Sequence, residues 1–200
     1  MTRIGIVVFD GFDLIDAGGP YEVFLTASRL RERDGHAGPF TVDLLSPDGA
    51  DAVAYGGMTL TGLADARTAA SYDVVVVPGT IDVAAALADT VLDAAITRLI
   101  GGAGLTTSVC TGAFFLARAG VLDGVAATTH WEDVDALRAA GVSGAVDGVR
   151  WADAGDVITS GGLTSGMHMA LHVVARVEGE DLAARTARQL DMDWSPDPAR

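Results

Sequence analysis

Short apolar segments alternate along the chain with longer segments whose apolar residues recur at helical spacing. The short segments are nearly continuous in apolar or β-branched residues, as expected of strands buried on both faces of a parallel sheet. The predicted strands are 3–9, 40–46, 72–79 (ending in a turn at Pro78-Gly79) and 105–109. The predicted helices are 20–33, 90–100, 111–119, 132–140, 164–176 and 180–189.

Two further segments are expected to form β-arms. Residues 53–63 are short and punctuated by glycine, and 149–152 and 157–159 flank a turn like the strands of a hairpin. Strands that alternate with helices predict an α/β fold, a three-layer α/β/α sandwich with a mostly parallel sheet. We find no linker or repeat, so we expect one domain over 1–200, with 191–200 as a C-terminal tail.

Charge and composition restrict the classes of partner. The 200 residues include 13 basic and 27 acidic ones, a formal net charge of −14. The basic residues are scattered, so we expect neither nucleic acid nor an anionic membrane surface as a partner. No apolar stretch approaches the ~20 residues of a membrane span, and the N-terminus has no signal-peptide pattern. The single cysteine cannot form an internal disulfide, so we expect a cytoplasmic protein.

That cysteine, Cys110, lies where a predicted strand meets a predicted helix. Sites in parallel sheets form at the carboxyl ends of strands, and the small residues Ser108 and Gly112 bracket the cysteine as a sharp nucleophile elbow requires. The start of the helix is expected to favour the thiolate through its dipole and free N–H groups. The alternative is a buried structural cysteine; the position favours a reactive thiol.

Three motifs in this order resemble the ThiJ/PfpI superfamily over almost the whole chain. They are the elbow 108–112 (Ser-Val-Cys-Thr-Gly), 127–131 (Ala-Thr-Thr-His-Trp) and 14–20 (Leu-Ile-Asp-Ala-Gly-Gly-Pro). The resemblance implies a flavodoxin-like, class I glutamine amidotransferase-like fold, with the isonitrile hydratase branch as the nearest match. It implies that Cys110 is the nucleophile and that Asp16 is its acidic partner. The residues alone leave Asp16 open between this role and a helix N-cap.

Neighbouring residues complete the predicted site. The resemblance assigns an oxyanion role to the turn Gly79-Thr80 together with the Thr111 N–H, although the superfamily usually has a second glycine where Thr80 stands; the alternative is an ordinary strand-end turn. The Thr111 hydroxyl is a candidate to bind substrate or water, or else to satisfy the helix end. Residues expected to line a small, partly apolar pocket are Phe12, Tyr21, Trp131 and Leu163, with Trp194 as a candidate lid.

The histidines are assigned no catalytic or metal role. His130 is expected to be a structural hydrogen-bonding residue. His168 and His172 have i, i+4 spacing but lack the following Glu and a third ligand of a zinc motif, so we predict no metal site. No organic cofactor is required either, because sulfur performs the covalent chemistry.

The leading hypothesis is hydration of isonitriles to N-formamides through thiolate attack, with Asp16 as acid and base and a small molecule as substrate. Thr111 stands where the protease-like members place a histidine, so peptidase activity is not expected. The alternatives are a stand-alone redox or ligand sensor domain, or another small-molecule cysteine hydrolase. We expect no helix-turn-helix region, because the chain ends at Arg200. A homodimer is expected from the resemblance alone.

Overall fold

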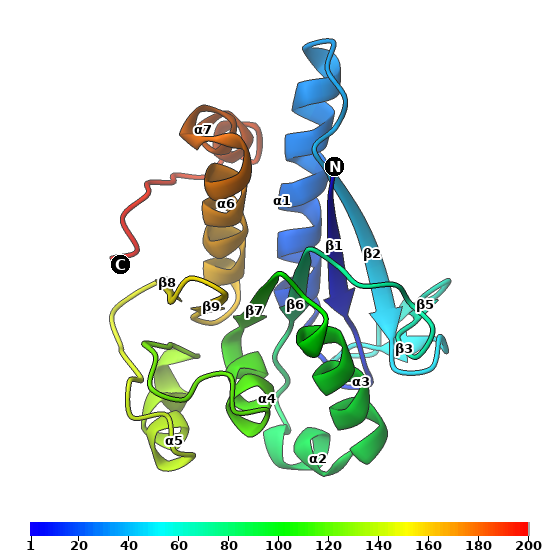
Figure 1. The fold of residues 1–200 in the computed structure, drawn as a ribbon, viewed down its shortest axis with the longest axis vertical. Helices are drawn as coiled ribbons and strands as arrows, with labels where there is room; N and C mark the ends of the chain where they lie inside the picture. The colour runs from blue at the N-terminus through cyan, green and yellow to red at the C-terminus, as the bar shows by residue number, and fades with distance from the viewer. Residues whose placement is uncertain (200) are drawn as a thin grey trace.

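The computed structural model describes residues 1–199, and its centre is a seven-stranded sheet in the order β5-β2-β1-β6-β7-β9-β8 (Figure 1). All neighbouring strands pair in parallel except β8, which runs antiparallel to β9 at one edge. The strands are β1 (Thr2–Val7), β2 (Phe40–Ser46), β5 (Ala64–Asp65), β6 (Val74–Val77), β7 (Leu105–Val109), β8 (Trp151–Asp153) and β9 (Val157–Ser160). A separate hairpin pairs β3 (Ala52–Val53) with β4 (Thr59–Leu60).

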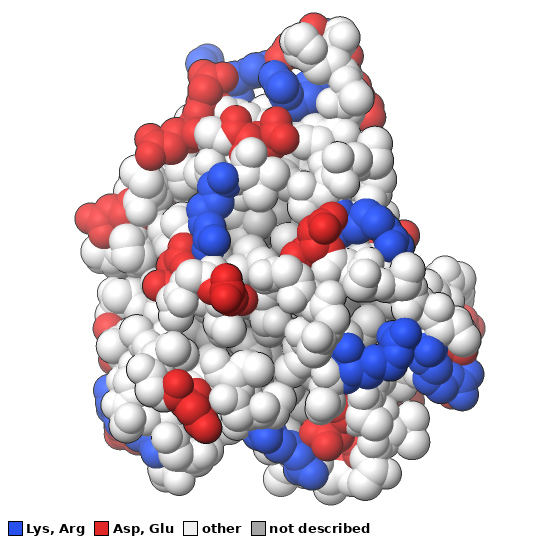
Figure 2. Space-filling model, in the orientation of Figure 1, with Lys and Arg blue, Asp and Glu red and all other residues white. Residues whose placement is uncertain are grey.

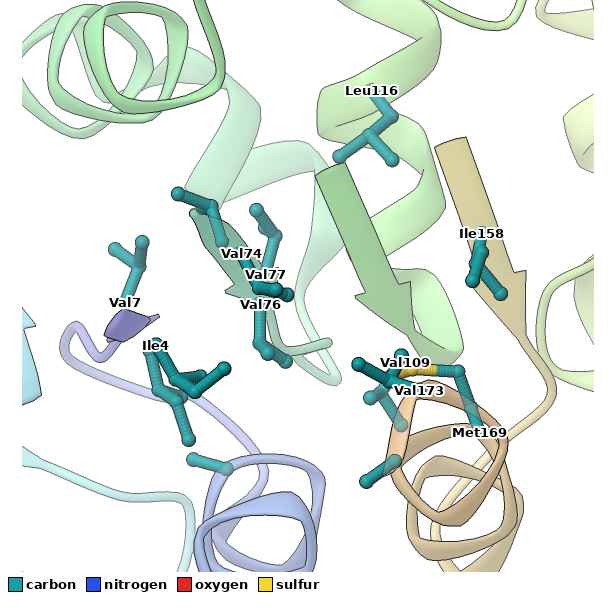
Figure 3. Close-up of a cluster of buried hydrophobic side chains, with 14 of the residues drawn as sticks. Ile4, Val7, Val74, Val76, Val77, Val109, Leu116, Ile158, Met169 and Val173 are labelled. Carbon is teal, nitrogen blue, oxygen red and sulfur yellow. The ribbon is translucent and has the colours of Figure 1, made fainter. Parts of the chain in front are cut away.

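Helices cover both faces of this sheet, which gives the predicted flavodoxin-like α/β sandwich. One layer contains α1 (Leu14–Arg33), α6 (Thr164–Glu178) and α7 (Glu180–Gln189), which pack against one another (Figure 1). The other helical segments are α2 (Val83–Ala88), α3 (Thr90–Gly101), α4 (Ala113–Arg118), α5 (Val134–Ala139) and the 3₁₀ turns η1 (Cys110–Gly112) and η2 (Trp131–Asp133). Figure 3 shows the central strands between the two layers.

The core forms where branched apolar side chains leave both faces of the central strands. All four residues of β6 are valines and all are buried. On one face Leu116 of α4 packs toward the strands, and on the other Met169 and Val173 of α6 do so (Figure 3). Each Å² of apolar surface removed from water stabilises the fold by about 25 cal/mol. This packing holds the strands in place and thereby positions their carboxyl ends.

The start of α1 was predicted wrongly. The sequence placed it at Pro20, whereas the helix begins at Leu14 and includes Pro20 in its interior. A Cβ on Gly19 would lie 2.7 Å from Met167 Cγ, so the glycine allows α1 and α6 to approach closely. Tertiary packing therefore outweighs the breaking tendency of Gly-Gly-Pro. Helix α2 and strand β5, which are short, were not predicted.

The predicted tail is attached to the domain as far as the structure describes it. The Arg150 N–H donates to Pro198 O at 2.7 Å, and Val149 forms an antiparallel bridge with Ala199. Across residues 1–199, none of the helices combines the length and the apolar character needed to cross a bilayer. On the face drawn in Figure 2, the arginines form several separate groups with acidic residues near them.

Candidate active site

The candidate site lies at the carboxyl ends of the central parallel strands, where the strand order reverses. Strand β2 follows β1 on one side and β6 lies on the other, so the crevice between β1 and β6 is the switch point at which such sheets bind ligands. Asp16 follows β1, Gly79 follows β6, Cys110 follows β7 and Leu163 follows β9. The predicted convergence of the first three residues is observed.

Cys110 occupies the predicted elbow in a strained conformation. Its φ is +56°, a region that non-glycine residues rarely adopt. A Cβ on Gly112 would lie 2.2 Å from Val77 O, so only glycine lets the helix start pass so close to strand β6. The Cys110 N–H donates to Gly161 O at 3.2 Å and Thr129 Oγ1 donates to Cys110 O at 2.8 Å. These bonds hold the backbone in the strained geometry. That geometry sets the direction of the thiol, which is half-buried.

Asp16 is fully buried in the first turn of α1. The Gly79 N–H donates to its Oδ2 and the Leu163 N–H donates to its Oδ1, both at 3.1 Å. The N-cap of α1 is Asp13 rather than Asp16, so the N-cap alternative for Asp16 is wrong. The carboxyl group is bound by two backbone donors and faces the Cys110 side chain, which lies within hydrogen-bonding reach.

Burial raises the pKa of Asp16 to about 7, with a further contribution from the negative charge of Asp13. Hydrogen bonds from Gly79, Leu163 and Cys110 oppose this shift but do not cancel it. The carboxyl group is therefore displaced toward its protonated form. The repelling charge, however, comes from Asp13 rather than from the sulfur.

The thiol is displaced in the opposite sense to the prediction. Desolvation, followed by the charge of Asp16, raises the pKa of Cys110 to about 12, and the Thr111 N–H only partly offsets this. The expected lowering is outweighed by desolvation of the thiol and by the negative charges of Asp16, Asp13 and Asp133. At neutral pH the thiol therefore keeps its proton until a base removes it.

The turn after β6 is tightly packed against the elbow. A Cβ on Gly79 would lie 2.7 Å from Thr111 Oγ1 and 2.9 Å from Asp16 Oδ2, so this position requires glycine. The Thr80 N–H donates to Thr111 Oγ1 at 2.8 Å, and the same hydroxyl donates to Thr80 O at 2.7 Å. The Gly79 and Thr80 N–H groups thus both have protein acceptors in this structure. The oxyanion role stays a prediction, with the Thr111 N–H, which faces the sulfur, as its best-placed member.

A cavity of about 350 Å³ opens above Cys110. Its lining includes three acidic residues that the sequence did not single out, Asp13, Glu132 and Asp133, and no Lys or Arg. His130 also lines this cavity, and its Nδ1 accepts a bond from the Glu132 N–H at 3.4 Å. The acidic charges became apparent only from the folded chain, because 13 and 132–133 are distant in sequence.

Leu163 contributes more than the predicted apolar contact. Its φ of +57° and ψ of −112° are strained for a residue with a Cβ, and this conformation directs its N–H to Asp16. Of the other predicted pocket residues, Phe12 is fully buried, and neither it nor Tyr21 or Trp194 lines the cavity at Cys110. Trp131 lines an adjacent cavity instead.

The pair His168 and His172 is divided between two environments. His172 Nε2 lies 2.7 Å from Asp153 Oδ2, and the His172 ring stacks on Trp151. His168 lines the adjacent cavity with Arg150. Within residues 1–199, no group of three or more His, Cys, Asp or Glu side chains has metal-binding geometry.

The model of the DJ-1/PfpI family matches residues 2–176 of this chain. An uncharacterized protein in the cpoL 5′ region of Streptomyces lividans is 39% identical over 68% of this chain and 92% of its own length. Isonitrile hydratase from Pseudomonas putida is 30% identical over 98% of this chain and 80% of its own length. The HTH-type transcriptional regulator GbdR of Pseudomonas aeruginosa is also 30% identical, but the match covers 90% of this chain and only 48% of the regulator.

Solved structures agree with these sequence matches. A ThiJ/PfpI family protein from Pseudomonas syringae superposes with a TM-score of 0.82 at 25% identity, over 98% of this chain and 76% of that one. DJ-1beta of Drosophila melanogaster has the same fold, with a TM-score of 0.78 at 18% identity over 96% of this chain and 98% of that one. The relatives thus include both an enzyme and transcriptional regulators.

Proposed function

The chain belongs to the DJ-1/PfpI family, and on that premise we propose that it hydrates an isonitrile to the corresponding N-formamide at Cys110 and Asp16. The observation that carries the proposal is the buried pair itself. A thiol with a raised pKa faces a carboxyl group whose pKa is about 7, with no cation among the groups that shift either one. Similarity over nearly the whole chain to isonitrile hydratase supports the reaction class.

The two groups share their protons as a coupled pair. As pH rises above about 7, Asp16 loses its proton while Cys110 keeps its own. In this state the carboxylate takes the thiol proton as sulfur attacks the terminal carbon of R–N≡C, and passes the proton to that carbon. The S–C and C–H bonds form together and give the thioimidate Cys110–S–CH=N–R. The addition has no leaving group.

Water then completes the reaction. Asp16 accepts a proton from water as its oxygen adds to the thioimidate carbon, and the nitrogen becomes N–H. The C–S bond breaks, the sulfur regains a proton through Asp16, and R–NH–CHO is released. The Thr111 N–H, which already faces the sulfur, stabilises negative charge on sulfur in both steps.

The test is turnover of an isocyanide by the wild type, Cys110→Ser and Cys110→Ala. We expect the wild type to convert cyclohexyl isocyanide to N-cyclohexylformamide, measured by mass spectrometry against an enzyme-free sample. Both variants are expected to lose activity at least about 10³-fold, because the covalent intermediate cannot form. Folded variants that retain wild-type rates would disprove the mechanism, and a folded wild type without product would disprove the reaction.

Ligand sensing is a second candidate, favoured by the similarity to the regulator GbdR over 90% of this chain. The redox form of this idea is weakened by the thiol, because oxidation requires the thiolate and the pKa of Cys110 is raised to about 12. Intact mass measured after mild peroxide treatment, together with the isocyanide assay, separates a sensor from an enzyme. Reversible oxidation confined to Cys110, without turnover of any isocyanide, would favour a sensor.

A further inference from the structure

A second cavity, of about 410 Å³, adjoins the cavity above Cys110 and has no role in the proposed chemistry. The two cavities share His130 and Leu163 in their linings and therefore lie side by side. The remaining lining residues of the second cavity are Trp131, Arg150, Gly162, Thr164, Ser165 and His168.

The two cavities carry opposite charge. The cavity at Cys110 is lined by Asp13, Glu132 and Asp133 and by no arginine. The second cavity is lined by Arg150 and His168 and by no Asp or Glu. Ligands with an anionic group are therefore repelled from the sulfur and attracted to the second cavity, which fixes the direction in which they bind.

Arg150, the cation that lines the second cavity, and the neighbouring His168 both have capacity for a ligand. The side chain of Arg150 donates to Ala199 O at 3.1 Å, and no carboxylate between residues 1 and 199 lies within ion-pair distance of it. Seven of the twelve arginines in residues 1–199, by contrast, form an ion pair with an acidic side chain. Nδ1 of His168 is buried without a hydrogen-bond partner, and the charge of Arg150 is close enough to lower the pKa of this histidine, after desolvation.

The second cavity also offers a flat apolar surface. Trp131 lines it with 59% of its surface exposed, and its ring lies 5.7 Å from that of His130. An exposed indole beside a guanidinium suits a planar or unsaturated group that ends in an anion. The planar fork of arginine matches a carboxylate in two parallel hydrogen bonds.

We propose that the second cavity binds a carboxylate of the substrate through Arg150, while the reacting end of the same molecule lies against Cys110. The proposal rests on the proposed function for its substrate class, an isonitrile that carries a carboxylate. Arg150 is then a specificity-determining residue for this reaction.

The kinetic test compares 4-isocyanobenzoate and 4-isocyanophenylacetate with their methyl esters, as matched charged and neutral substrates of two lengths. We expect the wild type to prefer at least one carboxylate over its ester by about ten- to a hundredfold in kcat/KM, the range of a charged hydrogen bond. Arg150→Gln removes the preference and leaves ester turnover within about twofold. Arg150→Lys, which keeps the charge, retains part of it, and Arg188→Gln, an equal charge change at another groove, leaves it intact.

A binding test separates this proposal from the proposed function. Benzoate is titrated against the wild type, Arg150→Gln and Arg188→Gln by ligand-observed NMR, with benzamide as the uncharged match. Benzoate binding that weakens about tenfold or more only in Arg150→Gln supports the carboxylate site even if no isocyanide is turned over. Turnover of isocyanides with equal binding and equal preference in wild type and Arg150→Gln overturns the carboxylate site and leaves the reaction standing. Thermal unfolding of each variant confirms that the substitution has not released the C-terminal segment.

Discussion

The fold shifts the pKa values of two aspartates, Asp16 and Asp153, in opposite directions. Asp16 is fully buried, and its hydrogen-bond donors are two backbone N–H groups. Asp153, on β8, is partly exposed and contacts His172 at 2.7 Å and Arg176 at 3.1 Å. The pKa of Asp16 rises to about 7, whereas that of Asp153 falls below its ordinary value.

The difference lies in the partners rather than in burial alone. Desolvation is the largest influence on both carboxyl groups and raises the pKa of each. At Asp153 it is outweighed by hydrogen bonds from His172 and Gly155 and by the charge of Arg176. At Asp16 the charged group that shifts the pKa is another acid, Asp13, and no cation is among the causes of the shift. A carboxyl group becomes a proton carrier at neutral pH when the fold buries it without a cation.

The largest expected effect that separates the two aspartates is on turnover. Asp16→Asn is expected to lower kcat by about 10²- to 10⁴-fold, because the thiol loses its base and the carbon its proton donor. Asp153→Asn is expected to stay within about twofold of the wild type. Rates of N-formamide formation by both purified variants check this, and equal losses in the two would show that Asp16 has no special role.

The pH dependence of the wild type sharpens the same contrast. The active form of the pair holds one proton, so kcat/KM is expected to rise with pH through an apparent pKa near 7 and then remain level over the range in which the thiol stays protonated. Asp153→Asn leaves this profile unmoved. A rate that falls as pH increases through 7 would mean that the carboxylic acid form is required and would refute the proton relay.

Stability is expected to respond to pH through Asp16. The pKa of this group is raised on folding, so its contribution is fully present below the unfolded value of ~3.9 and is lost as pH rises through about 7. Relative to the wild type, Asp16→Asn should therefore gain up to about 4 kcal/mol in the free energy of unfolding between pH 4 and pH 8. Urea unfolding at several pH values measures the slope, and parallel curves for the two proteins would contradict the raised pKa.

The smallest effect is expected at Asp153, with the opposite sign. Its pKa is lowered on folding, so its contribution is present above ~3.9 and is lost as pH falls through the folded value. Because the group is partly exposed, Asp153→Asn should cost only about 1 kcal/mol at pH 7, and the difference should vanish in acid. The same urea titrations provide the comparison; a loss that grows toward low pH would reverse the assignment.

Much of the fold could be predicted because it depends on local pattern. The bounds of β2, β7 and α7 agree with their sequence predictions, since each element has an uninterrupted periodicity and a clear stop. Helix α1 was misplaced because the contact that accommodates Gly19, its approach to Met167, joins residues far apart in the chain. The elbow was predictable for the opposite reason: Cys110 and Gly112, which shape it, are only two positions apart in sequence.

The sequence by itself determined the sandwich, the position of the cysteine elbow and the residue types around it, because strand patterns, small residues and a single cysteine are local features of the chain. Only the tertiary structure decided the ionisation of the pair and the charge of its surroundings. Asp16, Gly79 and Leu163 come from the ends of different strands, and Asp13 meets Glu132 and Asp133 only across the cavity. Desolvation and electrostatic interaction depend on distance in space, which the order of residues along the chain does not specify.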